Sequence, residues 1–165
     1  MSNYRRVRVD GGTYFFTVNL LERHRRLLVE HIDELRCSFR DAKHSRPFEI
    51  IAIVILPDHL HCIWKLPEGD SDNANRWSQI KTGFSKRLST GERLSKSRSV
   101  RRERGVWQRR FWERLLEDET DLHNHINYVY INPLKHKHVT HVCDWPYSSF
   151  HRDVKRGIYS ADWSG

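Results

Sequence analysis

Two apolar segments separated by a single Pro-Asp pair constrain the fold more than any other part of the sequence. Residues 48–56 and 59–66 are rich in β-branched and aromatic side chains, which favour strands, whereas Pro57 and Asp58 favour a turn. Such a short connection makes an antiparallel hairpin the simplest arrangement of the two strands. The sequence therefore predicts a fold that is built around an antiparallel sheet.

Hydrophobic periodicity predicts the other elements of the fold. Apolar residues at helical intervals indicate amphipathic helices, and short runs of β-branched and aromatic residues indicate strands. We expect the third helix to end before Pro133, because the residue that precedes a proline avoids the α-helical region. The further strands are expected at 13–20 and 106–116, and the helices at 26–43, 73–88 and 118–131.

The order of these elements predicts an α+β fold of the ferredoxin-like type. A strand, a helix, a hairpin, a second helix, a fourth strand and a third helix follow one another along the chain. This is the split β-α-β pattern, in which an antiparallel sheet carries its helices mainly on one face. We therefore expect the other face of the sheet to be free for a ligand.

Length and charge indicate one domain that binds a polyanion. The chain has 165 residues, enough for a single compact domain, 1–165, and too few for two comfortable ones. Its formal net charge of +8 attracts a nucleic acid or an anionic membrane surface. Residues 90–105 carry six basic and two acidic side chains, and we expect them to form a mobile basic loop.

The sequence lacks the features of a membrane or secreted protein. No apolar run approaches the roughly 20 residues of a membrane span, and the N-terminus lacks the apolar core of a signal peptide. The three cysteines, Cys37, Cys62 and Cys143, are far apart in the sequence. This spacing favours isolated thiols in a reducing cytoplasm over a disulfide framework.

The second strand of the hairpin carries two candidate metal ligands. Side chains alternate across a strand, so His59 and His61 share one face, and the apolar side chains beside them share the other. Neutral imidazole is a good ligand for divalent metals. Two histidines on a solvated strand face are the alternative interpretation. Asp58, in the turn, is a candidate to orient one of the imidazoles.

The third helix carries a candidate nucleophile. Tyr130 falls on the apolar stripe and is expected in the core, whereas Tyr128 and Asn132 lie one turn apart on the polar face. A tyrosine phenol is a weak nucleophile and needs a base or a metal-polarised phosphate. Two imidazoles and the amide oxygen of Asn132 would hold a divalent cation, Mg²⁺ or Mn²⁺, with positions left open for phosphate oxygens.

Basic and aromatic residues suggest how a nucleic acid is held. Single strands are bound by basic tracks combined with aromatic stacking, and residues 107–112 interleave both types. For any one arginine, a solvated surface charge is the alternative. Residues 152–165 form an expected C-terminal tail, and we hypothesise that its aromatic end folds over the active site and limits cleavage. The candidate nucleic-acid-binding residues are Arg5, Arg6, Trp107, Arg109, Arg110 and Lys135.

Five separated motifs occur together along the chain, at 11–18, 56–64, 107–112, 128–135 and 144–150. The second contains the His-hydrophobic-His pair and the fourth contains the single candidate tyrosine. With these motifs in this order, the chain resembles the HUH single-strand nucleases, and among them the REP-associated tyrosine transposases of bacteria. The resemblance covers most of the chain.

This resemblance implies a reaction, a cofactor and a substrate. Tyr128 would attack a phosphate of single-stranded DNA, which gives a 5′-phosphotyrosine and a free 3′-hydroxyl group. His59 and His61 would bind the divalent ion, with Asn132 as the third ligand. The substrate would be a repetitive extragenic palindrome (REP) that folds into a hairpin with a short tetranucleotide at its 5′ foot. The setting would be the bacterial cytoplasm, in association with the nucleoid.

Two other functions remain open on the sequence. A non-catalytic protein that binds hairpin DNA or RNA could use the same scaffold, but it would not need His59, His61 and Tyr128 to converge. A zinc hydrolase would need a closer third ligand and a carboxylate base. The oligomeric state is also open, because one nucleophile per chain is compatible with a monomer or a homodimer.

Overall fold

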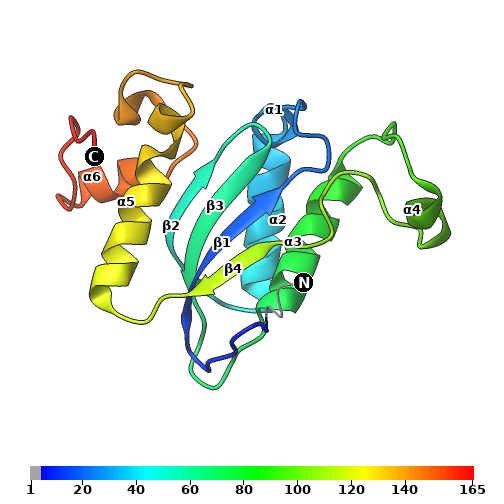
Figure 1. The fold of residues 1–165 in the computed structure, drawn as a ribbon, viewed down its shortest axis with the longest axis horizontal. Helices are drawn as coiled ribbons and strands as arrows, with labels where there is room; N and C mark the ends of the chain where they lie inside the picture. Colours follow the sequence, from blue (N-terminus) through cyan, green and yellow to red (C-terminus); the bar gives the residue numbers. More distant parts are fainter. Residues whose placement is uncertain (1–4) are drawn as a thin grey trace.

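An antiparallel sheet of four strands forms the centre of the molecule (Figure 1). The computed structural model describes residues 5–165. The strands are β1 (Thr13–Asn19), β2 (Glu49–Ile55), β3 (His59–Lys65) and β4 (Trp112–Leu115). Neighbouring strands are antiparallel and their order is β2-β3-β1-β4. This is the order of the ferredoxin-like split β-α-β fold, so the predicted α+β class is confirmed.

One face of the sheet is covered by α2 (Ile32–Ser45) and α3 (Asn73–Arg87). Alternation along β3 points Trp64 into this α2–α3 core, where its ring centroid lies 4.6 Å from that of Trp77 and 4.4 Å from that of Phe16. Aromatic rings in such contact contribute more than their buried area alone. The apolar face of β3, opposite to the face that carries the two histidines, was predicted to face the core, and the structure confirms this.

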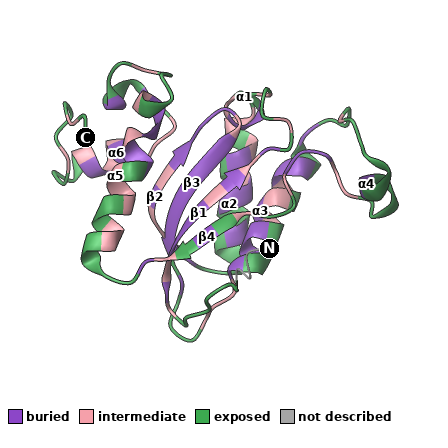
Figure 2. Cartoon of the chain, viewed as in Figure 1, coloured by how far each residue is buried: buried purple, intermediate pink, exposed green. Residues whose placement is uncertain are grey.

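The opposite face of the sheet is covered over β2 and β3 by α5 (Glu119–Lys135), beside which α6 (Phe150–Lys155) packs (Figure 1). Val54 and Ile63 from the strands and Val129 from α5 are fully buried in this α5 core. The prediction that this face is free is therefore wrong for β2 and β3, because both strands carry apolar side chains on both faces. Figure 2 shows β3 buried along nearly its whole length, whereas β4 carries exposed residues.

The outer edge of β2 is blocked by the segment that precedes α6. The backbone N–H of Ile55 donates to the carbonyl oxygen of Tyr147 at 2.8 Å, and that of Ser149 donates to Ile53 at 2.9 Å. The Ser149 hydroxyl accepts from the Ile53 N–H at 2.9 Å, and the Trp145 indole donates to the Ile55 carbonyl oxygen at 2.9 Å. Edge strands with unpaired backbone groups invite pairing with other chains. The motif at 144–150 thus protects this edge.

The helices differ from the prediction at two points. The helix predicted over 26–43 is divided at His31 into α1 (Leu27–Glu30) and α2. The third helix, α5, was predicted to end before Pro133 but continues through it to Lys135. Pro133 lies in the last turn of α5, so it removes one backbone N–H donor but no further helical turn follows for it to disrupt. Within the part of the chain that the structure describes, no helix is long and apolar enough to cross a membrane.

Residues 106–116 form less strand than predicted. Only β4 pairs with β1 along a ladder. Ahead of β4, the ammonium group of Lys81 donates to the carbonyl oxygens of Gln108 and Arg109 at 2.7 and 3.3 Å. These carbonyl groups bond to a side chain instead of to a neighbouring strand, so the pairing is interrupted there, and ahead of the interruption a single antiparallel bridge joins Trp107 to Leu20.

The basic stretch 90–105 has more structure than its composition predicts. It contains α4 (Lys96–Val100), and the side chain of Arg98 within it is buried. The Arg98 guanidinium donates to the carbonyl oxygens of Arg104 and Trp107, both at 3.1 Å. A buried cation is tolerated only where hydrogen-bond acceptors replace water. Here the chain that follows α4 supplies those acceptors.

Candidate active site

Two buried histidines of β3 face α5. His59 and His61 lie on the same face of the strand, as predicted, with ring centroids 5.0 Å apart. They are only 5% and 4% exposed, because α5 covers this part of the sheet. A polar side chain that is buried to this extent needs partners. The two imidazoles therefore do not lie on a solvated strand face.

The first imidazole is held by a carboxylate from the turn. His59 Nδ1 lies 2.7 Å from Asp58 Oδ1, and Arg23 Nε donates to Asp58 Oδ2 at 2.5 Å. An imidazole that donates from Nδ1 to a carboxylate presents the lone pair of Nε2. Asp58 thus occupies the orienting position that the sequence suggested. No pattern in the sequence points to Arg23, which lies far from the turn along the chain.

The second imidazole is held by a hydroxyl group from β1. His61 Nδ1 lies 2.8 Å from Thr17 Oγ1, because Thr17 is the partner of His61 in the β1–β3 ladder. Burial lowers the pKa of His61 to about 3, so the ring is neutral at physiological pH and can act as a ligand. Thr17 was missed by sequence reasoning, since only the register of the sheet places it beside His61.

Helix α5 brings Tyr128 and Asn132 to the two histidines. The Tyr128 ring centroid lies 5.3 Å from that of His61, and the side chain is 37% exposed. Asn132 is fully buried, lies beside the His61 ring, and donates from Nδ2 to the carbonyl oxygen of Tyr128 at 2.9 Å. This hydrogen bond to its own helix fixes which end of the Asn132 amide faces the histidines.

Tyr130 occupies the core, as the helical periodicity predicted. Its side chain is fully buried, and its hydroxyl group donates to a carboxylate oxygen of Asp153. Burial and the adjacent carboxylate raise the pKa of the Tyr130 phenol. A phenol with this environment is a poor nucleophile, so Tyr128 is the tyrosine of α5 that is placed to react.

Two acceptor atoms of the site have no partner among the described residues. Nε2 of His61 and Oδ1 of Asn132 are both buried without a hydrogen bond. Such atoms are rare in folded proteins and indicate a ligand. Across residues 5–165, no group of three His, Cys, Asp or Glu side chains is placed to hold a metal ion. Two imidazoles and one amide oxygen fit a divalent cation that accepts both nitrogen and oxygen.

The end of α5 adds positive charge beside Tyr128. Lys135 Nζ lies 5.2 Å from the centroid of the Tyr128 ring. His136, the residue that follows α5, places its ring centroid 5.3 Å from that of His59. Both side chains are exposed. A phosphate at the histidines would therefore meet a cation on the same side as the phenol.

Three of the candidate DNA-binding residues lie elsewhere, in a basic cleft on the α3 side of the sheet. This cleft has a volume of about 640 Å³ and is lined by seven basic side chains and one acidic side chain. Arg6, Trp107 and Arg109 all contribute to it. Burial lowers the pKa of Lys81, in its wall, to about 8. The structure thus separates the basic cleft from the histidines, which lie on the opposite face of the sheet.

The predicted residues differ in how they are placed in this cleft. Trp107 is 5% exposed and its indole N–H donates to the Lys81 carbonyl oxygen at 3.1 Å, so the ring belongs to the wall. The Arg6 guanidinium lies 4.2 Å from the Phe111 ring centroid. Arg109 is exposed and donates to Glu103 at 2.8 Å. Outside the lining of the cleft lie two further predicted residues, Arg5 and Arg110, both exposed.

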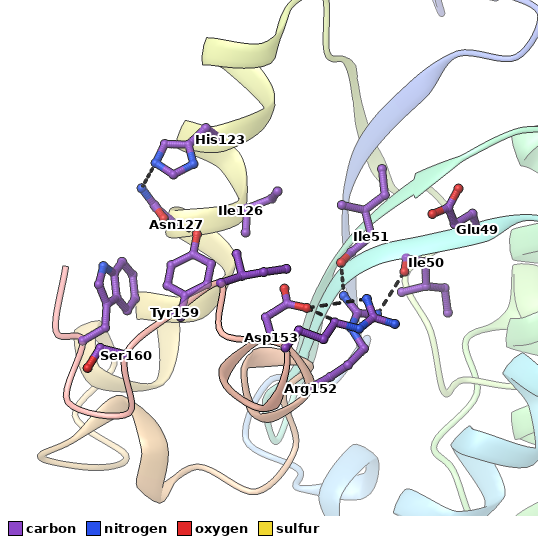
Figure 3. A pocket seen from close by; sticks show the side chains of 13 residues that line it. Glu49, Ile50, Ile51, His123, Ile126, Asn127, Arg152, Asp153, Tyr159 and Ser160 are labelled. Carbon is purple, nitrogen blue, oxygen red and sulfur yellow. Dashed lines mark hydrogen bonds and ion pairs between the residues drawn. The ribbon is translucent and has the colours of Figure 1, made fainter.

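Another pocket, of about 430 Å³, lies between α5, β2 and the C-terminal segment (Figure 3). Arg152 donates there to the carbonyl oxygens of Ile50 and Ile51, and the Tyr159 hydroxyl donates to Asn127 at 2.5 Å. The tail thus packs on the side of α5 that carries Asn127, beside β2. The hypothesised position over the active site is not the position found.

Comparison with known proteins identifies the family. No family model matches the chain. A REP-associated tyrosine transposase of Escherichia coli K12 is 47% identical over 100% of this chain and 92% of its own length. A Haemophilus influenzae protein assigned to the same group is 50% identical, over 100% of this chain and 94% of its own.

A solved structure agrees with these relatives. It is that of a REP-associated tyrosine transposase bound to a REP hairpin, with a TM-score of 0.87 and 47% sequence identity. The match covers 100% of this chain and 92% of the other. At this identity and coverage the similarity extends to the whole fold, including the strands and the helix that carry the site. The chain therefore belongs to the REP-associated tyrosine transposases, a family of transposase enzymes.

Proposed function

We propose that this protein is a metal-dependent single-strand DNA endonuclease and strand transferase that acts on hairpin-forming repetitive extragenic palindromes. One observation carries the proposal. The two buried acceptor atoms without partners, His61 Nε2 and Asn132 Oδ1, lie beside the one α5 tyrosine that is exposed, Tyr128. A protein that only binds DNA has no use for this convergence.

In the proposed reaction, the phenol oxygen of Tyr128 attacks the phosphorus atom of a DNA phosphodiester. The P–O3′ bond breaks, the phenol loses its proton to solvent, and the departing 3′ oxygen takes up a proton. A 5′-phosphotyrosine and a 3′-hydroxyl group result. Transfer is the reverse step, in which a 3′-hydroxyl group of another strand attacks the phosphotyrosine and releases Tyr128.

The residues around Tyr128 have distinct roles in this proposal. His59, His61 and Asn132 would hold Mg²⁺ or Mn²⁺, which would supply positive charge next to the phosphate. Asp58 and Thr17 fix the two imidazoles with Nε2 directed at the site. A cation such as Lys135 near a developing negative charge stabilises the transition state.

The DNA partner is supported by charge and by the solved relative. The chain carries a formal net charge of +8, and seven basic side chains line the basic cleft. That relative is bound to a REP hairpin. We infer that the basic cleft holds DNA phosphates through Arg6, Arg109 and their basic neighbours, while the reacting phosphate lies on the other face.

The test is a gel assay for a covalent protein–DNA adduct. Labelled single strands that contain hairpin repeats are incubated with the protein in Mn²⁺, Mg²⁺ or EDTA. We expect an adduct that requires the metal and disappears in Tyr128→Phe. Mapping the 5′ end that the protein carries would identify the reacting phosphate.

Tyr130→Phe is the matched control. We expect this variant to keep the adduct, although it should be less stable by about 1–3 kcal/mol because Asp153 loses its hydrogen-bond donor. Thermal unfolding of each variant separates loss of chemistry from loss of folding. Tight hairpin binding without an adduct in either metal would instead favour a non-catalytic DNA-binding protein.

A further inference from the structure

An exposed tryptophan lies on the catalytic face of the sheet, at its open edge. Trp112, the first residue of β4, is 54% exposed. It pairs with Thr17 of β1, which pairs in turn with His61 of β3. Residues directly opposite one another on antiparallel strands project from the same face. Trp112, Thr17 and His61 therefore form one row across the sheet.

The row sets how far the indole lies from the reaction centre. Neighbouring strands are about 4.8 Å apart, so the backbone of Trp112 lies about 10 Å from that of His61. Only Thr17, whose hydroxyl group holds the His61 ring, stands between them in the row. Trp112 is thus close enough to meet a base next to a phosphate that is bound at the histidines.

The cover of α5 stops short of this part of the face. α5 packs on β2 and β3 and contacts Phe15 of β1, whereas Figure 2 shows exposed residues on β4 beside the buried central strands. Arg114, which follows on the same face of β4, has a side chain 55% exposed and an ion pair of 3.2 Å with Asp121 of α5. The surface around Trp112 therefore combines an aromatic ring with a cation.

The position of β4 also matters for the path of the DNA. The active site lies on the α5 side of the sheet and the basic cleft on the α3 side. The β2 edge is blocked by residues 145–149, whereas β4 is the other edge of the sheet. The direct route for a single strand between the two sites passes β4, on which Trp112 lies.

We propose that Trp112 is a stacking platform for a DNA base adjacent to the phosphate that Tyr128 attacks. This inference rests on the proposed function and adds a base-binding subsite to it. Stacking on an exposed aromatic ring is how many proteins hold single strands without reading their sequence. A base is favoured over an apolar partner because Arg114, two residues later on the same face of β4, places a cation near the ring, and a second exposed cation, Arg110, lies two residues earlier in the chain.

The test uses a fluorescent base whose emission falls when it stacks. 2-Aminopurine is placed in turn on each side of the reacting phosphate, as mapped from the covalent adduct, in a hairpin with single-stranded flanks. Binding is measured in EDTA so that no cleavage occurs. We expect quenching at one of the two positions with the unaltered protein.

Two substitutions distinguish the effect of the aromatic ring from the effect of an apolar side chain alone. Trp112→Leu keeps an apolar side chain and should weaken binding of the flanked hairpin by roughly 5- to 150-fold and abolish the quenching. Trp112→Phe keeps an aromatic ring and should retain much of the affinity and much of the quenching. Binding of a blunt hairpin without single-stranded flanks should not change, and thermal unfolding should show that each variant is folded.

Failure of this inference can be distinguished from failure of the proposed function. If Trp112→Leu matches the unaltered protein in affinity and quenching, the subsite does not exist. If affinity falls while quenching persists, the ring contacts the DNA elsewhere and the inference is also overturned. If Trp112→Leu instead converts a dimer to a monomer in sedimentation with quenching intact, the surface binds a second copy. Absence of any adduct with the unaltered protein would overturn the proposed function itself.

Discussion

At the scale of single residues, the site depends on which imidazole nitrogen faces it. Asp58 and Thr17 each occupy the Nδ1 side of one histidine, so both rings present Nε2. Neither residue touches the phosphate in the proposed mechanism. Their effect is to restrict the rotation of both rings before a metal binds, and the Asp58 carboxylate, which only accepts hydrogen bonds, also selects the tautomer of His59.

Thr17→Val tests this positioning role. Valine has nearly the shape of threonine but lacks the hydroxyl group, so the His61 ring loses its partner. We expect Mn²⁺ affinity, measured by calorimetry, to fall by about 10- to 100-fold. Thr17→Ser keeps the hydroxyl group and should retain most of the affinity. Equal affinity in Thr17→Val would contradict the role of Thr17, whereas no binding to the unaltered protein would contradict the metal site.

The residues of the site were predictable to different degrees. Alternation along one strand was enough to place His59 and His61 together, and helical spacing was enough to separate Tyr128 from Tyr130. Thr17 could not be found in this way. It belongs to another strand, and its place depends on the register between β1 and β3, which local sequence does not contain.

At the scale of elements, the basic stretch after α3 is anchored by arginine side chains. Arg104 donates to the carbonyl oxygens of Ser85, Leu88 and Ser89, and it pairs with Glu92. The last carbonyl groups of a helix have no partners within the helix. Arg104 therefore serves as a cap for the C-terminal end of α3.

Arg104→Ala should destabilise the fold although it changes only one basic residue. It removes the donor to the carbonyl groups of Ser85, Leu88 and Ser89 and the partner of Glu92, whose side chain is 8% exposed. We expect a loss of about 2–3 kcal/mol in the free energy of unfolding, measured with urea. Arg101→Ala, at an exposed position in the same stretch, should change it by less than about 0.5 kcal/mol. Equal losses in the two variants would show that Arg104 is not a cap.

Elements with a strong local sequence pattern were predictable. Segments whose backbone groups are bound by side chains from elsewhere in the chain were not. The hairpin of β2 and β3 follows from two β-rich runs and a short turn, and it appears within one residue of the expected bounds. The segment 106–116 also contains aromatic and branched apolar residues, but the side chain of Lys81 binds two of its carbonyl groups. In 90–105, composition cannot distinguish a solvated arginine from Arg98, which is buried.

At the scale of the whole molecule, the proposed reaction centre and the basic cleft lie on opposite faces of the sheet. The buried histidines face α5, while the basic cleft lies beside α3. A ligand that contacts both must be long and flexible, which suits a strand of nucleic acid and does not suit a small substrate. Its affinity should then contain a large contribution from released counterions.

Neutralising an exposed cleft residue should change the salt dependence of binding. Arg102→Gln removes one charge from the lining, so the slope of log affinity against log salt should decrease in magnitude by roughly 0.7–0.9. The measurement is a fluorescence-anisotropy titration of the hairpin at several salt concentrations. Arg36→Gln, on the exposed side of α2, should leave the slope unchanged. Identical slopes for both variants would place the DNA outside the cleft.

The hydrogen bond from Asn132 to the Tyr128 carbonyl oxygen has a mechanical consequence. It joins the proposed nucleophile and the proposed third ligand within one turn of α5, while the two histidines belong to β3. A tilt of α5 against the sheet would move phenol and amide together and leave their mutual geometry intact. Such a tilt would separate both from the histidines at once, so small rigid-body motions of this helix would engage or disengage the whole reaction centre as a unit.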